Sequence, residues 1–342
     1  MRRGKRTLLV AIPATLALGA GLLPALSVPR ASATAPHAGY RIAFLPKNVG
    51  NPYFDTAFAG AQRAAKENGD TVTQVGPSKA DPSGQITYIN TLIQQHVNAI
   101  AISADDPGVP VPMLKKAMSR GIKVVSYDSD VQPDGRQIFC NQANTEQIGR
   151  IEVQIIGREL GYKGQIAILS AASTSPNQNT WIGYMKKELA LPKYKNMRLV
   201  TTVYGNDDPA VSTTQAQGLL TKYPNLKGII SPTTVGIKAA AQVVKVAGKS
   251  GKVIVTGLGT PNDMRSYVLD GTVPDFALWN PGDLGYLAEY TAHELVSGML
   301  KPATGATYKA GKLGTYKVGA NGVVLLGPPF EFTKANIGKF HF

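Results

Sequence analysis

The chain has 342 residues, a formal net charge of +14 and a single cysteine, Cys140. One cysteine excludes a disulfide within the chain, so a folded state must depend on its hydrophobic core. The length is enough for two ordinary domains. The lysines are scattered singly or in pairs along the sequence. A nucleic-acid-binding protein concentrates such residues in a stripe, so we expect no nucleic-acid partner.

Residues 1–33 have the features of a secretory signal peptide. The start is basic, the stretch Leu8–Val28 is almost wholly apolar, and small residues occupy positions 31 and 33. Pro13 and Pro24 argue against the alternative, a membrane-spanning helix. Cleavage after Ala35 fits the same rule. No cysteine lies near the cut to accept a lipid, so we expect a soluble periplasmic or secreted protein with a formal net charge of +9.

The first half of the remaining chain alternates short apolar runs with helical patterns. Residues 42–45 predict a first strand. Asn51 and Pro52 then resemble an N-cap and first residue of a helix that ends at Asn68, with Gly69 as its stop. Further strands are expected over 71–75, 99–103, 123–127 and 138–141, with a helix begun by Pro82 and another ended by Gly121 between them. This alternation predicts parallel strands joined by crossover helices.

The pattern restarts after a helix expected over 145–160. Strands are expected over 165–170, 198–204, 228–231, 253–257 and 276–280, and helices near Pro176, Pro209, Val235, Pro261 and Pro281. Two halves of the same kind predict two similar doubly wound α/β lobes. In the tail, residues 314–319 and 323–326 predict a hairpin around Ala320-Asn321-Gly322, and 330–332 a last strand.

Polar side chains follow the expected strands in both halves. In open parallel sheets, ligands bind beyond the carboxyl ends of the strands. These side chains form a set of donors and acceptors that suits sugar hydroxyls, each of which donates and accepts a hydrogen bond, while two aromatic rings could cover an apolar sugar face. The candidate ligand-binding residues are Lys47, Asn48, Phe54, Asp105, Asp128, Asn177, Gln178, Pro232, Thr234, Trp279 and Asn280.

Several of these residues have a structural alternative. Asp128 could cap the turn after its strand, and Trp279 could belong to the core. Lys47 is more informative, because a lysine that closes a buried strand is rare. Asp207-Asp208-Pro209 reads as a helix start, so we leave it out of the expected site.

Catalytic interpretations find little support. None of the four histidines follows an expected strand, and no zinc-ligand spacing, nucleophile elbow or phosphate-binding glycine loop occurs. Cys140 ends a strand without a histidine partner in view. We therefore expect no catalytic residue, no metal site and no cofactor.

The motifs together resemble the rhamnose-binding proteins of ABC sugar importers, a group related to the autoinducer-2-binding proteins. The resemblance spans residues 40–342. It rests on Lys47-Asn48, Gly50-Asn51-Pro52-Tyr53-Phe54-Asp55, Tyr127-Asp128-Ser129-Asp130, Asn141-Gln142, Asn177-Gln178-Asn179 with Trp181, Pro232-Thr233-Thr234, residues 276–281 and residues 332–337.

The resemblance implies a type I periplasmic binding fold, with a three-crossing hinge and a cleft that closes on a monosaccharide-sized ligand. It implies a permease of an ABC transporter as partner, and we expect a monomer. The expected lobes are 40–142 with about 281–310, and 143–280 with about 311–342.

The same resemblance separates two ligands. Lys47, Asp128, Gln178 and Pro232 match the autoinducer-2 branch, whereas Asn177, Thr234 and Asn280 depart from it, two of them by placing an amide where that branch has a carboxylate. These departures favour rhamnose, with autoinducer-2 or another sugar or sugar alcohol as the alternative. A sugar-sensing regulator would need an N-terminal helix-turn-helix in place of the signal peptide, and an exported α/β enzyme is the remaining rival.

Overall fold

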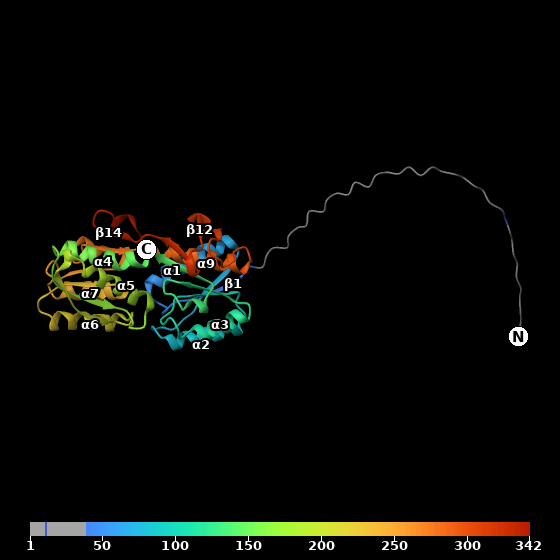
Figure 1. The fold of residues 1–342 in the computed structure, drawn as a ribbon, viewed down its shortest axis with the longest axis horizontal. Coiled ribbons are helices and arrows are strands. Elements are labelled where there is room, and N and C mark those ends of the chain that lie inside the picture. The colour runs from blue at the N-terminus through green and yellow to red at the C-terminus, as the bar shows by residue number, and fades with distance from the viewer. Residues whose placement is uncertain (1–10, 12–38) are drawn as a thin grey trace. The chain divides into compact units, whose positions relative to one another are not determined.

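The computed structural model describes Ala11 and residues 39–342, and Figure 1 shows the fold. Residues Ala38–Phe342 form one compact unit. The predicted signal peptide, Ala11 apart, lies outside the described residues. Among the residues described, no helix is both long and apolar enough to cross a membrane.

The first lobe is built on a six-stranded parallel sheet. Its order is β13 (Val323–Gly327), β5 (Ile138–Ala143), β4 (Lys123–Tyr127), β3 (Ala99–Ile102), β1 (Arg41–Leu45) and β2 (Thr71–Gln74). Successive side chains of a strand point to opposite faces, so Ile42 and Phe44 join one core cluster while Ala43 and Leu45 join another. Helices cover both faces: α1 (Pro52–Asn68) and α9 (Pro281–Val296) on one, α2 (Pro82–Gln94) and α3 (Val111–Ser119) on the other.

The second lobe repeats this plan with a parallel sheet in the order β7 (Asn196–Tyr204), β6 (Lys163–Ser170), β8 (Leu226–Ser231) and β9 (Ile254–Gly257). A parallel bridge between Leu258 and Ala277 attaches β10 (Asp275–Leu278), which pairs antiparallel with β14 (Phe330–Thr333). The helices of this lobe are α4 (Thr145–Glu159), α5 (Pro176–Leu189), α6 (Pro209–Lys222), α7 (Thr234–Val246) and α8 (Pro261–Leu269).

The helix starts expected from the sequence are confirmed, because their capping chemistry is local. The Asn51 side chain accepts a hydrogen bond from the Tyr53 backbone N–H at 3.1 Å, and α1 ends at Gly69 with φ of 74°. Proline lacks the N–H that a first helical residue leaves unpaired and has a helical φ already. It therefore occupies the start of α1, α2, α5, α6, α8 and α9.

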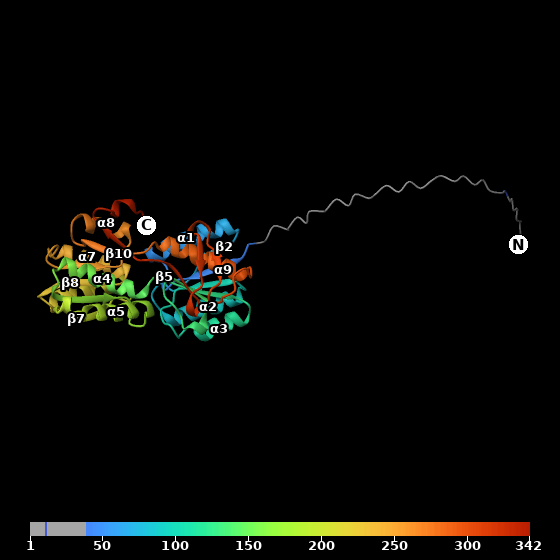
Figure 2. The same ribbon diagram turned by 45° about the horizontal axis from the view of Figure 1, so that its top comes forward.

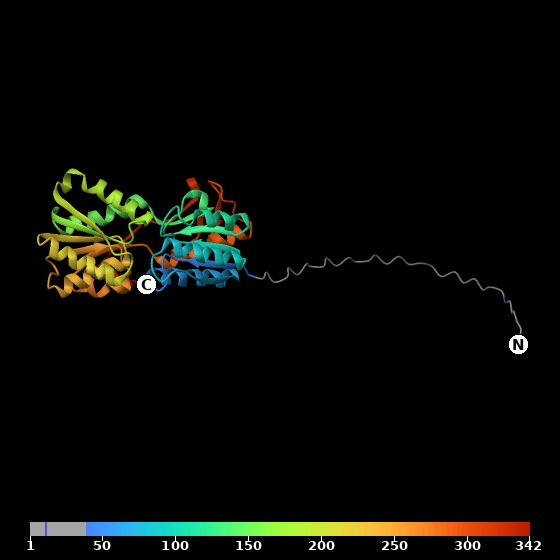
Figure 3. The same ribbon diagram turned by 90° about the horizontal axis from the view of Figure 1, so that it is seen from below.

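The chain crosses between the lobes three times. The crossings run from β5 to α4, from β10 to α9, and from β13 to β14. In Figure 2, β5 and β10 are labelled on the two sides of this junction, and Figure 3 shows the two lobes from below. The expected fold class, two α/β lobes with parallel sheets joined by a three-crossing hinge, is confirmed.

The C-terminal tail differs from the predicted hairpin. β12 (Thr315–Lys317) pairs antiparallel with β11 (Thr307–Lys309), while β13 pairs in parallel with β5. Asn321 and Gly322, both with positive φ, therefore lead into the first sheet and do not reverse a hairpin. The physical reason is that β5 would otherwise be an edge strand with unpaired backbone groups. The sequence predicts residues 311–342 as part of the second lobe, whereas β13 pairs with the first lobe and β14 with the second. The lobe boundaries remain a proposal.

Helices α1 and α9 approach each other closely at glycine. A methyl group on Gly285 would lie 1.8 Å from the carbonyl oxygen of Ala57, and one on Gly60 would lie 1.8 Å from the carbonyl oxygen of Gly282. Any side chain at these positions would push the helices apart. This contact holds the start of α9, and hence the second crossing, against the helix that follows β1.

Candidate functional site

A cavity lies where the carboxyl ends of the two parallel sheets meet. The space between its walls is about 350 Å³ including its opening to solvent. Both lobes contribute to its walls. The lining residues are Lys47, Asn51, Tyr53, Phe54, Asp128, Asn177, Gln178, Trp181, Asp207, Pro232, Thr233, Thr234, Leu258, Leu278 and Trp279.

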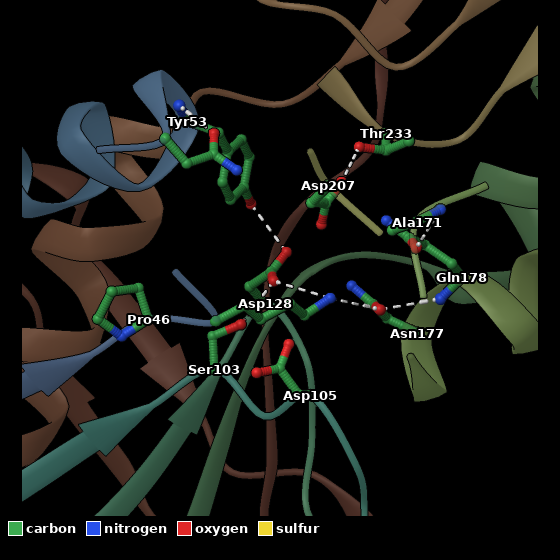
Figure 4. A network of polar contacts seen from close by, with 12 residues as sticks. Pro46, Tyr53, Ser103, Asp105, Asp128, Ala171, Asn177, Gln178, Asp207 and Thr233 are labelled. Atoms are coloured by element: carbon green, nitrogen blue, oxygen red, sulfur yellow. Dashed lines mark hydrogen bonds and ion pairs between the residues drawn. The ribbon is translucent and has the colours of Figure 1, made fainter. Parts of the chain in front are cut away.

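One wall is a chain of hydrogen bonds that ends on Asp128 (Figure 4). The indole Nε1–H of Trp279 donates to the Tyr53 hydroxyl at 2.9 Å, and that hydroxyl donates to Asp128 Oδ1 at 3.0 Å. Ser103 donates to Asp128 Oδ2 at 2.7 Å. Burial, and next the negative charge of Asp128, raise the pKa of Tyr53 well above its usual value, so the phenol keeps its proton and donates.

Lys47 lines the cavity from the first lobe and reaches the second. It follows β1, and its side chain is only 2% exposed. Its Nζ donates to Asn177 Oδ1 at 3.0 Å and lies 3.9 Å from Asp128 Oδ2 (Figure 4). Because Lys47 comes from the first lobe and Asn177 begins α5 of the second, this hydrogen bond joins the two lobes directly.

Two cavity aspartates stand on left-handed backbone. Asp128, directly after β4, has φ of 60°, and Asp207, between β7 and α6, has φ of 50°. Aspartate and asparagine tolerate this conformation better than most residues, which explains their use at these tight turns. Asp207 accepts a hydrogen bond from the Thr233 hydroxyl. Burial raises the pKa of Asp207, and the nearby charge of Lys47 opposes that rise.

Aromatic rings form the apolar part of the cavity. Trp279 meets Tyr53 edge-on at 6.2 Å between ring centroids and lies 5.9 Å from Trp181. Tyr53 also meets Phe54 edge-on at 5.1 Å. The rings come from the start of α1, from α5 and from the second crossing, so both lobes contribute to one aromatic surface.

Eight of the eleven residues expected from the sequence line this cavity: Lys47, Phe54, Asp128, Asn177, Gln178, Pro232, Thr234 and Trp279. Trp279 does so while 4% exposed, so it belongs to the core and also lines the cavity; its contact with a ligand stays a prediction. Gln178 is held in place because its Oε1 accepts from the Ala171 backbone N–H at 3.2 Å.

The other three expected residues lie outside the lining. Asn280 accepts hydrogen bonds from the backbone N–H groups of Gly282 and Asp283, and so caps α9. Asn48 lines a separate hollow beside Asn51 and Asp207. Asp105 is fully buried; its Oδ2 accepts from the Asp81 backbone N–H at 2.9 Å, and its Oδ1 has no hydrogen-bond partner among the described residues. Burial raises the pKa of the Asp105 carboxyl to about 7, and the positive charge of Lys47 limits that rise. Asp105 therefore interacts electrostatically with a cavity residue although it does not line the cavity.

Sequence reasoning missed seven lining residues, of which Asp207 is the most informative. We had taken Asp207-Asp208-Pro209 as a helix start, but only Asp208 caps α6, through the N–H groups of Ala210 and Val211. Asp207 turns into the cavity one residue earlier. The sequence did contain a signal for Asp207: two acidic residues precede Pro209, and an N-cap needs only one of them. The other missed residues are Asn51, Tyr53, Trp181, Thr233, Leu258 and Leu278.

The arrangement is suited to holding a neutral polar ligand. Fixed acceptors, a lysine donor and amides surround a small space with aromatic walls, which is the pattern of a binding site. Cys140, the remaining nucleophile candidate, is buried away from the cavity beside Thr291, and burial raises the pKa of its thiol to about 12. At such a pKa the thiolate that a nucleophile needs is scarce.

Two α/β lobes that enclose a polar cavity at their strand ends define a cleft-type solute-binding protein. The chain belongs to the family described as periplasmic binding protein domain, which it matches over residues 42–299.

Solved structures similar to this chain include three of particular interest. A sugar ABC transporter protein from Actinomyces odontolyticus is 43% identical, with 89% of this chain and 98% of that chain covered and a TM-score of 0.71. A solute-binding protein from Clostridium phytofermentas with bound L-rhamnose is 38% identical, with 88% and 98% covered and a TM-score of 0.85. LsrB from Clostridium saccharobutylicum in complex with AI-2 is 28% identical, with 88% and 100% covered and a TM-score of 0.85.

Proposed function

We propose that this chain is the extracytoplasmic solute-binding component of an ABC importer and that its ligand is a monosaccharide, L-rhamnose. The observation that carries the proposal is the polar bridge in the cavity. Lys47 and Asp128 from the first lobe meet Asn177 and Asp207 from the second in the walls of one cavity. A ligand with hydroxyl groups on opposite sides would bond to both lobes and favour their closure.

The balance of charge favours an uncharged ligand. The lining holds one lysine and two aspartates, so an anionic sugar would meet a net negative surface. Hydroxyl groups can donate to Asp128 and Asp207, accept from Lys47, and do either with Asn177 and Gln178. The ligand class is therefore a neutral polyol.

Rhamnose has two observations in its favour. The Clostridium phytofermentas relative, which holds L-rhamnose, is 38% identical over nearly its whole length. A 6-deoxy sugar also carries a methyl group, which the Phe54 and Trp279 rings could shelter at a gain of about 0.8 kcal/mol per buried carbon.

The alternative ligand is autoinducer-2. The LsrB structure that holds AI-2 has the same TM-score of 0.85, and Lys47, Asp128, Gln178 and Pro232 fit that branch. Asn177 and Thr234 do not fit it, and both line the cavity of this chain. The departure at Asn280 carries less weight, because its side chain caps α9.

The remaining parts of the proposal concern the context of the protein. Residues 1–33 would direct export and be removed, the mature chain would act as a monomer, and a permease would receive the closed, loaded form. Binding without conversion is supported by the relatives, which are described as transport and binding proteins. A sugar-sensing regulator and an exported enzyme have no such support.

Calorimetry and thermal unfolding with a panel of ligands test the proposal. The panel is L-rhamnose, other deoxy sugars, pentoses, sugar alcohols and autoinducer-2, each analysed for products after incubation. Rhamnose at a hundred times its Kd should stabilise the protein by about 2.7 kcal/mol and be recovered unchanged. A rise in Tm with another sugar alone would replace rhamnose but keep the class, and product formation would overturn the class.

A further inference from the structure

Eleven basic side chains gather at the end of the second lobe that faces away from the cavity. We call this set the basic pole. Ten of them are exposed and Lys249 is half-buried. The set is Lys163, Lys186, Lys187, Lys193, Lys195, Arg198, Lys222, Lys227, Lys245, Lys249 and Lys252.

The parallel sheet brings these residues together from distant parts of the sequence. Because β6, β7, β8 and β9 are parallel, all four strands begin at one edge, and the cavity lies at the other. Lys163 pairs with Asn196 at the start of β7, next to Lys195. The Lys227 side chain passes over Gly164, and Lys252 precedes β9. Helices that return between the strands end at this same edge, with Lys186, Lys187, Lys222 and Lys245 in their last turns.

Few acidic groups balance the basic pole. Glu188 is buried and pairs with Arg150 as well as Lys193, and Asp270 pairs with Lys245. Glu159, Asp275 and Glu331 pair with Arg158, which is not one of the eleven. Within residues 39–342, only Lys193 and Lys245 of the eleven basic residues form an ion pair. The matching end of the first lobe is different, because Glu67, Asp70 and Glu294 accompany its basic residues.

Helix ends account for only part of this charge. A lysine in the last turn of a helix interacts favourably with the helix dipole, which explains Lys186, Lys222 and Lys245. The strand-start residues Lys163, Lys227 and Lys252 lie on no helix, so the dipole does not explain them. They are exposed and make no ion pair within the described chain.

Exposed apolar side chains lie among these lysines. Tyr162 precedes Lys163, Leu191 precedes the turn with Lys193, and Val246, 82% exposed, ends α7 beside Lys245. Leu269, 53% exposed, ends α8 and comes to the same end because its neighbour Asp270 pairs with Lys245. Basic residues interleaved with protruding apolar side chains are typical of proteins that lie on an anionic membrane surface.

We propose that the basic pole docks on the surface of an anionic lipid bilayer. Lysines would approach lipid phosphates while Val246, Leu269, Leu191 and Tyr162 enter the headgroup region. The pole lies opposite the cavity within its lobe, so docking leaves the cavity open to solvent. The surface therefore provides a way to keep the protein at a membrane, and it does not depend on which ligand the cavity binds.

Vesicle flotation tests the proposal with residues 36–342, which contain the whole compact unit. The vesicles contain equal parts of phosphatidylglycerol and phosphatidylcholine, with pure phosphatidylcholine as reference. The protein should float only with the anionic vesicles at low salt, and 0.5 M NaCl should release most of it. The triple variant Lys163→Glu, Lys227→Glu, Lys252→Glu should bind more than about a hundredfold more weakly, since each lysine near an anionic surface contributes about 1 kcal/mol and each glutamate adds repulsion.

A matched triple variant distinguishes an effect of the basic pole from an effect of the protein's net charge. Lys66→Glu, Lys116→Glu and Arg120→Glu reverse three exposed first-lobe residues without an ion pair in the described chain, and this variant should float like the original protein. Equal loss in both variants, or no flotation of the original protein, would overturn the proposal. Tight binding to inorganic polyphosphate without flotation would overturn it too, in favour of a soluble polyanion. Unchanged thermal unfolding of both variants shows that they are folded.

Discussion

Lys47 is surrounded by more negative charge than it can balance. Asp128 lies 3.9 Å from its Nζ, and the charge of Lys47 also lowers the pKa values of Asp105 and Asp207 against the effect of burial. A buried carboxylate needs donors, and removing them is costly. Ligand hydroxyls that donate to Asp128 and Asp207 would supply such donors.

Asparagine substitutions test these two acceptors separately. Asparagine tolerates the positive φ of Asp128 and Asp207, so Asp128→Asn and Asp207→Asn should fold normally. Each should weaken ligand binding by about 2 kcal/mol, because a charged acceptor for a hydroxyl is lost. Asp208→Asn is the matched control, since Asp208 caps α6 and asparagine caps equally well. Calorimetry that finds native affinity for Asp207→Asn would remove Asp207 from the site.

A second buried carboxyl group, Glu289 on α9, faces the end of α1. It accepts from the Asn68 amide at 2.9 Å on Oε2, while its Oε1 has no donor partner and lies near the Asp70 carboxylate. Burial, and next the charge of Asp70, raise the pKa of Glu289 to about 9. Glu289 therefore carries a proton at neutral pH and donates it towards Asp70. His293 contacts Asp70 from the same helix at 2.8 Å.

The raised pKa of Glu289 predicts that stability falls as pH rises. Between pH 4.5, its usual pKa, and about 9, the folded state holds a proton that the unfolded state has lost. The stabilisation is complete below pH 4.5 and is lost as pH rises towards 9. His293, whose pKa its Asp70 partner raises, contributes in the same direction above pH 6.5.

Glu289→Gln should flatten this dependence, because glutamine keeps the neutral hydrogen bonds. We expect the change in unfolding free energy between pH 5 and 8.5 to shrink by more than about 1.4 kcal/mol, the equivalent of one pKa unit. Urea unfolding at several pH values measures it, with Glu294→Gln on the same helix as control. Parallel curves for the original protein and Glu289→Gln would show that Glu289 titrates normally.

At the scale of elements, the packing of α1 against α9 positions the cavity. Helix α1 begins beside Tyr53 and Phe54, and α9 begins two residues after Trp279. Their glycine contact lets the two backbones touch, so the rings at their starts are held at a fixed separation.

Gly285→Ala tests this contact. The added methyl group would meet the Ala57 carbonyl oxygen, so we expect a loss of about 1–3 kcal/mol in stability from overpacking. Gly183→Ala is the matched control, because Gly183 is exposed on α5 with nothing within 4 Å of the added methyl group. That change should stabilise the protein by about 0.5–1 kcal/mol through helix propensity. Chemical unfolding measures the free energy of unfolding of both variants. Equal changes in the two would contradict the close approach of α1 and α9 at Gly285.

At the scale of the whole molecule, hydrogen bonds cross the cleft directly. Lys47 and Asn177 join the lobes, and the Trp279 indole joins the second crossing to α1. Such contacts favour the closed arrangement, and a ligand adds its own bonds to the same balance.

Asn177→Ala should therefore open the unliganded protein. Loss of a hydrogen bond to a charged group, worth about 1.5–3 kcal/mol, would shift the open and closed populations by about tenfold or more. Small-angle X-ray scattering should show a larger radius of gyration for this variant without ligand. Asn179→Ala is the control, because Asn179 bonds to Ser173 within its own lobe. An unchanged radius would mean that Lys47–Asn177 does not hold the lobes together.

Much of the fold was predictable from sequence because it rests on local chemistry. Proline at helix starts, Asn51 and Gly69 at the ends of α1, and buried apolar runs marked the elements to within a few residues. Five polar lining residues were expected on similar grounds, since polar residues after parallel strands meet at one edge: Lys47, Asp128, Asn177, Gln178 and Thr234. Asp207 and Asn280 were misassigned because capping and lining use the same residue types, and only the direction of the side chain separates them.

By itself, the sequence determined the two α/β halves and most of the polar cavity, because strand period, capping and turn chemistry act over a few residues. Only the tertiary structure decided that β13 joins the first sheet, that Lys47 reaches Asn177, and that scattered lysines form one basic pole. Those features depend on which strands lie side by side and in which direction. That arrangement is set by burial of both sheet faces and by pairing of strand edges across the whole chain.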